Sequence, residues 1–421
     1  MKIRVLGGAR EVGGSCIAVE TEQCKVALDY GIKLDKVTDE YPKNFDAVIV
    51  SHAHLDHSGS LARLSKSRNK QVIVGSKVTR DVTVDLLKDM IKIQSSKASE
   101  AVSYDESAVN KVRDSWLTSE SVALPGLAVE LYGAGHVAGA KMIGLSSEGK
   151  TVLYTGDFCI HDTEILKGCD VDALPESPDV LISESTYGGK VRPPRGELID
   201  QFLRRVSSTM KGRGNILVPT FAFHRTQEMA KRIDQAMDSG VLPRYNAYTI
   251  SNLAQKINGH FNANKHLFTE EIQRQEHPFE YKYVKHVERT TDVEEPAIVV
   301  CTAGFGHAGA SLSLLTQWAE DEENNVILTS GFLPSDSPLK LAKEKRYFRV
   351  DGEKIPVRAR FDQIELSGHA DQKEIVQLVS KLKPKRTFLV HGDMEQAKAL
   401  LKEISEMTEV YIPEKGEGIF V

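Results

Sequence analysis

A dense group of imidazole and carboxylate side chains follows one strand-like segment of the sequence. In VIVSHAHLDHSG, a single short stretch presents His52, His54, Asp56 and His57. Because side chains two apart in an extended segment lie on one face, His52 and His54 can point the same way. Imidazole and carboxylate groups suit Zn²⁺ and similar first-row ions. Four such groups within six residues are more than one short segment would give to a single closed four-ligand site, so the spacing predicts two neighbouring metal ions with ligands completed from elsewhere.

The elements that must position these residues change in character along the chain. Short apolar strands with glycine-containing turns dominate the first half, and helical periodicity interrupts them over 79–94 and 106–118. Strand and helix then alternate from about residue 189, which is typical of a mostly parallel sheet. A helix, a buried strand and a second helix follow. We therefore predict an α/β fold with segments 1–188, 189–365 and 366–421.

Composition excludes several classes of protein. The 421 residues suggest two or three domains, and 41% hydrophobic with 27% charged residues is ordinary for a globular chain. No apolar run reaches the roughly 18 residues that span a bilayer, and no signal-type segment opens the chain, so we expect a cytoplasmic protein that makes no membrane contact. The five cysteines form no C-x-x-C pair and are expected to be buried thiols.

Charge is distributed unevenly although the net charge is only −5. Residues 190–256 carry 12 Lys and Arg against 5 Asp and Glu, and residues 340–360 carry 8 against 3. One interpretation is ordinary solvated helix faces. The other interpretation is a basic surface that contacts a polyanion such as a nucleic acid.

The H-x-H-x-D-H motif resembles the signature of the metallo-β-lactamase superfamily, whose fold is an αββα sandwich with metals at one edge of the two sheets. Further family motifs have matches in VALDYG, GAGHVAG and LYTGDF, at Asp29, His136 and Asp157. The resemblance implies two Zn²⁺ per chain, with Mn²⁺ as an alternative. The implied roles are His52, His54 and His136 for one ion; Asp56, His57 and His391 for the other; Asp157 as the bridge; and Asp29 as a brace of the ligand loop.

Three later motifs narrow the resemblance. Glu184 in SESTYG, His369 in LSGHAD and His391 in LVHGD resemble those of the β-CASP nucleases, in which an α/β domain is inserted between the first two. The implied fold is thus an αββα metallo-β-lactamase sandwich with an inserted α/β β-CASP domain. The opening LGGAREVGGSCIAVE looks closest to short archaeal relatives of the endonuclease subunit of the cleavage and polyadenylation specificity factor. The histidine at 391 resembles the RNA-processing branch, whereas DNA-processing relatives have an aliphatic residue there.

The resemblance implies hydrolysis of phosphodiester bonds in single-stranded RNA. His369 would be the general acid, oriented by Glu184, while Ser367, Gly368 and Arg225 are candidates for substrate binding. Endonucleolytic cleavage is the main prediction. A 5′→3′ exoribonuclease of the RNase J type is an alternative, because the S-G-H-A sequence is similar to a neighbourhood that holds a terminal monophosphate. A non-catalytic RNA-binding scaffold is the other alternative. A homodimer through the C-terminal GIFV is left open.

Several positions depart from the family pattern. Phe305 and His307 lie where many relatives carry methionine and a paired glycine, and TSGFLPSDSPLKLA lacks a G-T-x-G that often follows. His224 occupies a position usually held by glycine. His161 is assigned no role.

Overall fold

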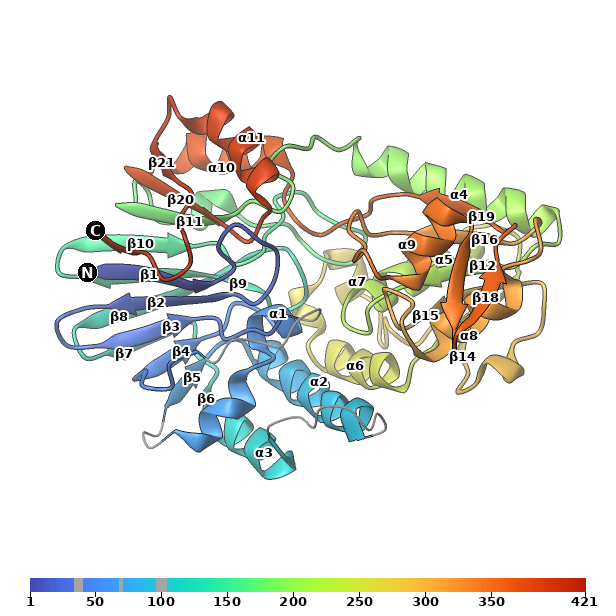
Figure 1. Ribbon diagram of the computed structural model, residues 1–421, viewed down its shortest axis with the longest axis horizontal. Helices are drawn as coiled ribbons and strands as arrows, with labels where there is room; N and C mark the ends of the chain where they lie inside the picture. The colour runs from blue at the N-terminus through green and yellow to red at the C-terminus, as the bar shows by residue number, and fades with distance from the viewer. Residues whose placement is uncertain (34–40, 68–70, 96–103) are drawn as a thin grey trace. The chain divides into compact units, whose positions relative to one another are not determined.

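The structure is a computed structural model that describes residues 1–33, 41–67, 71–95 and 104–421. Its internal contacts divide the chain into two compact units (Figure 1). Unit 1 comprises Met1–Val191 with Gly368–Val421, and unit 2 comprises Arg192–Ser367. The boundaries 1–188, 189–365 and 366–421 stay predictions beside this division.

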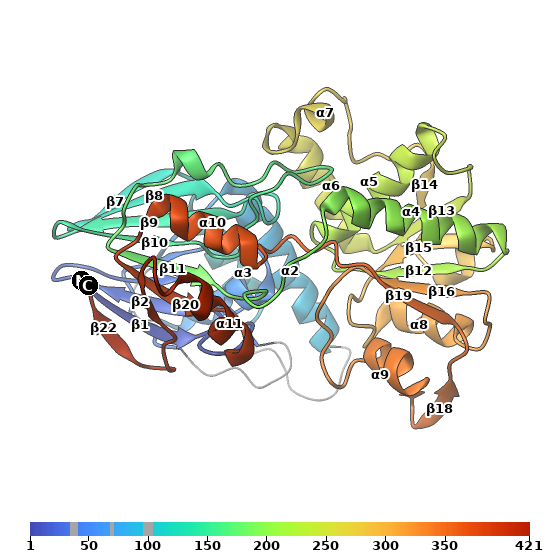
Figure 2. The same ribbon diagram turned by 90° about the horizontal axis from the view of Figure 1, so that it is seen from above.

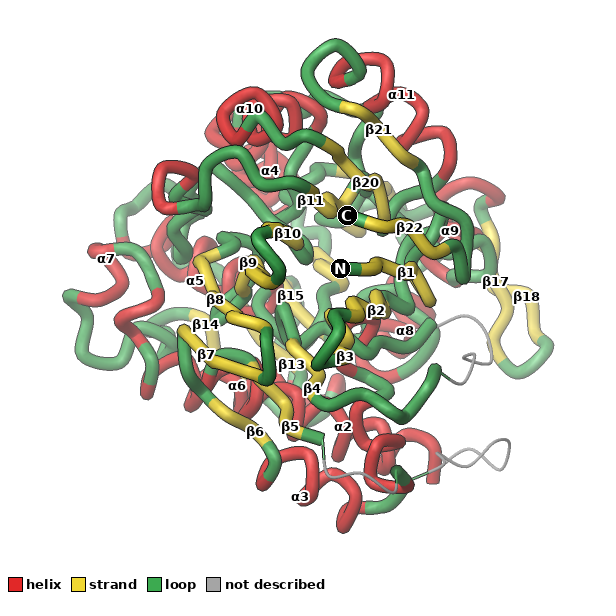
Figure 3. The backbone as a smooth tube through the Cα atoms, turned by 90° about the vertical axis from the view of Figure 1, so that its left-hand side faces the viewer, coloured by secondary structure: helices red, strands yellow, loops and turns green. Residues whose placement is uncertain are grey.

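Unit 1 is built on two seven-stranded sheets. In sheet order, the first contains β22 (Gly418–Phe420), β1 (Lys2–Gly7), β2 (Cys16–Glu20), β3 (Lys25–Leu28), β4 (Ala47–Ile49), β5 (Val72–Val74) and β6 (Trp116–Leu117). The second contains β21 (Glu409–Tyr411), β20 (Arg386–Val390), β11 (Val180–Glu184), β10 (Lys150–Tyr154), β9 (Lys141–Ser147), β8 (Leu127–Gly133) and β7 (Ser121–Leu124). Seen end-on, the two sheets lie as adjacent layers (Figure 3).

Helices cover the outer side of each sheet, which gives the predicted αββα layering. The helical elements of unit 1 are α1 (Leu55–Ser58), η1 (Leu61–Lys66), α2 (Lys77–Ser95), α3 (Glu106–Asp114), η2 (Val171–Ala173), α10 (Gln372–Leu382) and α11 (Met394–Ile404). Leu87 of α2 and Val109 of α3 pack with Val48 of the first sheet. Helices α10 and α11 lie on the side of β11 and β20 (Figure 1). Between the sheets, apolar side chains such as Ile49 and Val152 form a continuous core.

The ligand candidates follow the carboxyl ends of strands in both sheets. β3 is parallel to β4, and β10 is parallel to β11, which is parallel to β20. These central strands are almost fully buried, as expected for strands covered on both faces. Their carboxyl ends therefore leave polar side chains at one edge of the sandwich.

Unit 2 contains a six-stranded sheet in which every neighbouring pair is parallel. Its order is β14 (Val284–His286), β13 (Asn246–Ile250), β15 (Ala297–Cys301), β12 (Ile216–Pro219), β16 (Asn325–Leu328) and β19 (Arg360–Gln363). The hairpin β17 (Tyr347–Val350) and β18 (Glu353–Pro356) stands apart from it. The helical elements are α4 (Arg195–Lys211), α5 (Arg225–Asp238), α6 (Asn252–Ala263), η3 (Lys265–Leu267), α7 (Glu270–Gln273), η4 (Thr290–Asp292), α8 (Gly309–Trp318) and α9 (Pro338–Lys345).

The unit 2 sheet is covered on both faces (Figure 2). Side chains of α4 and α5 pack against Ile216 and Val218 of β12. Those of α8 and α9 pack against Leu217, which points to the opposite face. The predicted alternation of strand and helix thus corresponds to a parallel sheet between helices.

Three further expectations concern the rest of the chain. The C-terminal strand β22 pairs with β1 of the same chain, the internal arrangement that the sequence left open beside dimer pairing. All five cysteines are buried and free, as predicted. Among the described residues, none of the helices has the length and apolar character needed to cross a bilayer.

Candidate metal centre

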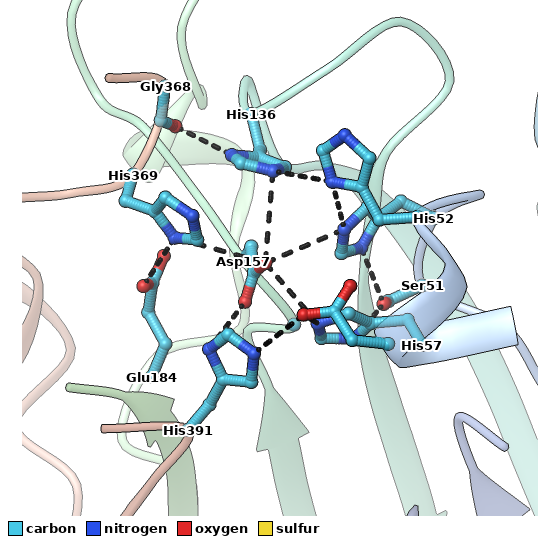
Figure 4. A network of polar contacts seen from close by, with 12 residues as sticks. Ser51, His52, His57, His136, Asp157, Glu184, Gly368, His369 and His391 are labelled. Carbon is cyan, nitrogen blue, oxygen red and sulfur yellow. Dashed lines mark hydrogen bonds and ion pairs between the residues drawn. The ribbon is translucent and has the colours of Figure 1, made fainter. Parts of the chain in front are cut away.

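Seven predicted ligands converge at the sheet edge of unit 1 (Figure 4). They form two groups in which the candidate ligand atoms of each group lie within 4.8 Å of one another: His52, His54, His136 and Asp157, and separately Asp56, His57 and His391. Asp157 touches both groups. Its Oδ2 is 3.5 Å from His52 Nε2 and 3.3 Å from His57 Nε2, and its Oδ1 is 3.4 Å from His391 Nδ1.

Asp29 holds the ligand loop from behind. This carboxylate is completely buried, and its residue adopts a left-handed conformation with φ of 60°, which non-glycine residues rarely adopt. Oδ1 accepts the backbone N–H of Ser51 at 2.7 Å. Oδ2 accepts the Ser51 hydroxyl, His57 Nδ1 and the Tyr154 hydroxyl, at 2.7–2.8 Å. One side chain thus connects the β4 loop with β10.

These hydrogen bonds decide which nitrogen of two histidines carries the proton. His57 donates from Nδ1 to Asp29. Because Ser51 gives its single hydroxyl proton to Asp29, its oxygen accepts from His52 Nδ1, 3.0 Å away. His52 Nε2 is left with a bare lone pair, the form that binds a metal. Burial alone would lower the pKa of His57, but the carboxylates of Asp157 and Asp29 raise it well above its usual value, so a metal ion at His57 Nε2 would displace a proton.

Two more ligands are oriented in the same way. His136 Nδ1 lies 2.8 Å from the carbonyl oxygen of Gly368, which can only accept. Thr186 donates its hydroxyl to the carbonyl of His391, so its oxygen accepts from His391 Nδ1 at 3.2 Å. His391 itself has φ of 49°, and its backbone N–H binds Gly8 on the other sheet. In His136 the unprotonated atom is again Nε2. His391 Nε2 lies 3.3 Å from Oδ2 of Asp56, another ligand candidate of the same group.

The electrostatics of the cluster fit a cation. Burial lowers the pKa of His52 and His136 well below the usual value and that of His54 to about 4, so these imidazoles are neutral. Burial alone would raise the pKa of Asp157, but the imidazoles of His391 and His57 lower it, so the carboxylate is ionised. Neutral imidazole and ionised carboxylate are the ligand forms for Zn²⁺.

Buried atoms that make no hydrogen bond point to the same conclusion. Within the described residues, His57 Nε2 and Asp157 Oδ1 are buried and make no hydrogen bond. His54 Nδ1 lies 3.1 Å from His52 Nε2 and 3.3 Å from His136 Nε2, and one ring proton on His54 Nδ1 cannot satisfy both of these nitrogens well. Such groups are costly to bury together unless a cation lies between them. The residues present therefore fit bound metal ions.

A second polar pair lies beside the ligands. His369 Nδ1 donates to Glu184 Oε2 at 2.8 Å, and Glu184 Oε1 accepts the backbone N–H of Phe158 at the same distance. Burial alone would lower the pKa of His369, but the carboxylates of Glu184 and Asp157 raise it. A histidine that is protonated at Nδ1, held by a carboxylate and next to the ligands has the geometry of a general acid.

The predicted substrate-binding residues have other partners. The Gly368 carbonyl orients His136, whereas the Ser367 carbonyl accepts from Arg192 at 2.9 Å. Arg225 lies in unit 2 as the first residue of α5, and its guanidinium pairs with the buried Glu228. A role for these three residues in binding substrate stays a prediction.

Glu374 is a connecting residue that the sequence analysis missed. Its Oε1 accepts the backbone N–H groups of Ile160 and His161 and the His161 ring, at 2.9–3.1 Å. Its Oε2 accepts the N–H of Asp371 in a capping box. The carboxylate thus joins the loop after Asp157 to the segment after His369. The D-x-x-E spacing at 371–374 could have predicted the helix cap, but no local signal reports the contact with a distant loop.

Two other histidines have structural settings. His224 adopts φ of 69°, in the region that favours glycine, at the start of α5. His307 is exposed and lies 3.5 Å from the Asp336 carboxylate.

Comparison with known proteins adds to this geometry. Three family models match: the metallo-beta-lactamase superfamily over residues 10–196, the Beta-Casp domain over 226–332, and the Zn-dependent metallo-hydrolase RNA specificity domain over 354–413. These matches lie on both units.

Similar proteins occur in archaea and animals. The chain is 28% identical over 430 residues to RNase aCSPSF2 of Saccharolobus solfataricus, covering 99% of this chain and 85% of the relative. It is 29% identical to Probable RNase MJ4 of Methanocaldococcus jannaschii, covering 100% of both. It is 29% identical to Integrator complex subunit 11 of Gallus gallus, covering 99% and 73%. A solved protein of unknown function from Enterococcus faecalis shares the fold, with a TM-score of 0.60, 15% identity and 99% coverage of both chains.

Proposed function

The chain belongs to the metallo-β-lactamase superfamily and to its β-CASP ribonucleases, and from this premise we propose that it cleaves single-stranded RNA internally with two zinc ions. The observation that carries the proposal is the pair of ligand groups that share Asp157, with the His369–Glu184 pair beside them. His52, His54 and His136 would hold one ion, and Asp56, His57 and His391 the other. When bound, such ions make hydroxide available at neutral pH and offset the negative charge that grows on a phosphate.

The protein's own residues supply orientation and a proton. Asp29 keeps the protons of His52 and His57 on Nδ1, so that both Nε2 atoms face the centre. Glu184 holds the proton of His369 on Nδ1 and favours the charged ring. A ring in that state can give its Nε2 proton to the departing ribose oxygen, which otherwise leaves as a poor, charged leaving group.

The test uses one 5′-monophosphorylated RNA, labelled separately at each end, with the wild-type chain and Asp157→Ala in Zn²⁺ or Mn²⁺. Internal fragments that the variant does not produce would support an endonuclease centred on these ligands. Mononucleotides released first from the 5′ end would favour the exoribonuclease alternative. Binding without cleavage in either metal would overturn the enzymatic proposal and favour a scaffold.

Three further expectations accompany the proposal. A cytoplasmic location and a homodimer stay predictions, and sedimentation of the metal-loaded chain tests the second. The predicted use of zinc rather than manganese is tested by the metal content of the protein purified without added metal.

A further inference from the structure

Three phenylalanine rings meet at one end of the unit 2 sheet. Phe221, Phe305 and Phe332 follow β12, β15 and β16, which are neighbouring parallel strands. The rings of Phe221 and Phe305 have centroids 5.0 Å apart and are inclined at 88°. The rings of Phe305 and Phe332 are 6.1 Å apart and inclined at 75°. We call these three residues the aromatic cluster.

The cluster lies where an open α/β sheet offers a binding crevice. After β12 the chain enters α5, which packs on the face of Ile216 and Val218. After β15 it enters α8, which packs on the opposite face with Leu217. Loops that leave neighbouring strands toward opposite faces open a crevice at their carboxyl ends, the usual ligand position in such folds. Phe221 and Phe305 come from these two loops.

The rings remain accessible. Phe221 is 38% exposed and Phe332 is 46% exposed, although phenylalanine is normally buried. Because neighbouring rings meet edge to face, Phe305 covers at most one face of each partner ring. Gly304 permits the close approach, since a Cβ there would lie 3.1 Å from the Phe221 ring. An exposed ring face at the usual ligand position of such a sheet is suited to stacking on another flat group.

The helix that begins beside the cluster is rich in basic residues. The Ser337 hydroxyl donates to the Phe305 carbonyl at 2.7 Å and also caps α9, whose eight residues include three lysines and one glutamate. The segment 340–360 that begins in this helix has 8 Lys and Arg against 3 Asp and Glu. Exposed rings beside cationic side chains are the combination that binds single-stranded nucleic acid, through stacked bases and neutralised phosphates.

We propose that the aromatic cluster is a base-stacking site for single-stranded RNA. The choice of RNA as occupant rests on the proposed function, and the stacking role rests on the geometry of unit 2. The site would accept any base, because every base has a flat face, and it would act on substrate affinity rather than on the chemical step.

The first experiment measures RNA binding to the full chain carrying Asp157→Ala, so that the RNA stays intact. Phe221→Leu and Phe332→Leu are introduced singly into this background, and Phe420→Leu, a change at a 71% exposed ring on β22, is the matched control. The probes are a single-stranded RNA of mixed sequence and a set of copies each lacking one base. Loss of one stacked base weakens binding by about 5- to 100-fold.

We expect each cluster variant to weaken binding of intact RNA about tenfold, and the control to leave it unchanged. One position in the RNA should carry the stacked base. RNA that lacks this base should bind the Asp157→Ala parent more weakly than intact RNA does. The leucine variant that has lost the stacking ring should bind the two RNAs equally. Phe332→Trp, which keeps an aromatic ring at this position, should bind intact RNA at least as tightly as the Asp157→Ala parent. Equal affinities across all proteins, or equal losses for intact and base-free RNA, would overturn the proposal. So would a change in self-association without a change in RNA affinity.

Failure of this inference can be separated from failure of the proposed function. If the wild-type chain cleaves RNA while the cluster variants bind it normally, only the stacking site is overturned. If the base-removal pattern is seen but the metal-loaded wild type cleaves nothing, the stacking site stands and the catalytic proposal falls.

Discussion

The strand ends of the two units carry different kinds of side chain. In unit 1, loops at the carboxyl ends carry buried histidines and carboxylates whose protons are fixed by neighbouring hydrogen bonds. In unit 2, the equivalent loops of three parallel strands carry phenylalanine rings, of which Phe221 and Phe332 are exposed. The hydrogen bonds in unit 1 fix one geometry of the ligand side chains, as a catalytic site requires. The exposed rings in unit 2 would accept RNA bases of any sequence. Changes in unit 1 should therefore act mainly on kcat, and changes in unit 2 mainly on binding.

The largest effect is expected for Asp157→Ala, because this carboxylate touches both ligand groups. Losing several kcal/mol of transition-state stabilisation corresponds to about a thousandfold or more in rate. Metal content and RNA cleavage should fall together. Asp114→Ala, which removes an exposed carboxylate paired with Arg113, is the control and should change neither. A variant that retains both metal and activity would contradict the shared-ligand interpretation.

His369→Gln should follow, with a loss of about 10²–10⁴ in kcat and normal metal content, since it removes a proton donor and not a ligand. Glu184→Gln should lose less, because the ring would remain but would be held more weakly. Single-turnover cleavage and metal analysis of both variants provide the measurement. Loss of metal from His369→Gln would instead make this residue part of the metal site.

Asp29→Asn is expected to cost about 10–100-fold in metal affinity or activity, because the proton positions of His52 and His57 both depend on this side chain. Titration of the metal-free protein with Zn²⁺ measures the loss. Asp46→Asn, at another carboxylate that accepts a backbone N–H in the first sheet, is the matched control. Equal Zn²⁺ affinities in the two variants would contradict a role for Asp29 in holding the metal ligands.

Glu374→Gln should lower kcat by at most about tenfold, with metal content and KM unchanged. It should also lower the free energy of unfolding by about 1–2 kcal/mol, because hydrogen bonds to a charged group are lost. Burial alone would raise the pKa of Glu374, but the His161 ring and the backbone N–H groups lower it to about 2. The stabilisation is therefore present above the ordinary carboxyl pKa and disappears as the pH falls toward 2.

Urea unfolding of both proteins from neutral to acidic pH checks this dependence. The two stabilities should converge on acidification. A difference that stays constant down to the lowest pH would contradict the role of the charged carboxylate.

Arg225→Gln should have the smallest effect, and it tests whether unit 2 contacts the RNA backbone. If Arg225 contacts an RNA phosphate, the slope of log affinity against log salt should fall by about 0.7, as for one lost contact with a single strand. If it only neutralises Glu228, which Arg195 also binds, the slope should stay constant and only stability should fall. Lys282→Gln, at an exposed ion pair of the same unit, is the control.

The fold could be predicted largely because strong local patterns and ordered motifs agree. The buried runs around β4, β11 and β20 predict central strands, and polar residues at their ends predict a site at the sheet edge. Periodicity over 106–118 correctly predicted a helix but not its end: α3 ends at Asp114, because Trp116 begins a strand that pairs with β5. That pairing partner lies far away in the sequence.

The hydrogen bonds that support the site could not be predicted from the sequence. Ser51, Tyr154 and Thr186 are ordinary residues of strand ends, and nothing local reports that they bind Asp29 or His391. The exposure of the phenylalanine rings could not be predicted either, because isolated phenylalanines after buried strands normally belong to the hydrophobic core. Ligand types could be predicted from chemistry, whereas the proton positions required three-dimensional neighbours.

The distance along the chain between the members of the second ligand group has a consequence for biosynthesis. All members of the first group have been made once translation passes Asp157, but His391 lies 335 positions beyond Asp56. The backbone of His391 must also dock on Gly8, at the opposite end of the sequence. A nascent chain therefore emerges from the ribosome with only the first ligand group complete, and the second group can form only after the whole intervening unit has been synthesised and His391 has docked on Gly8.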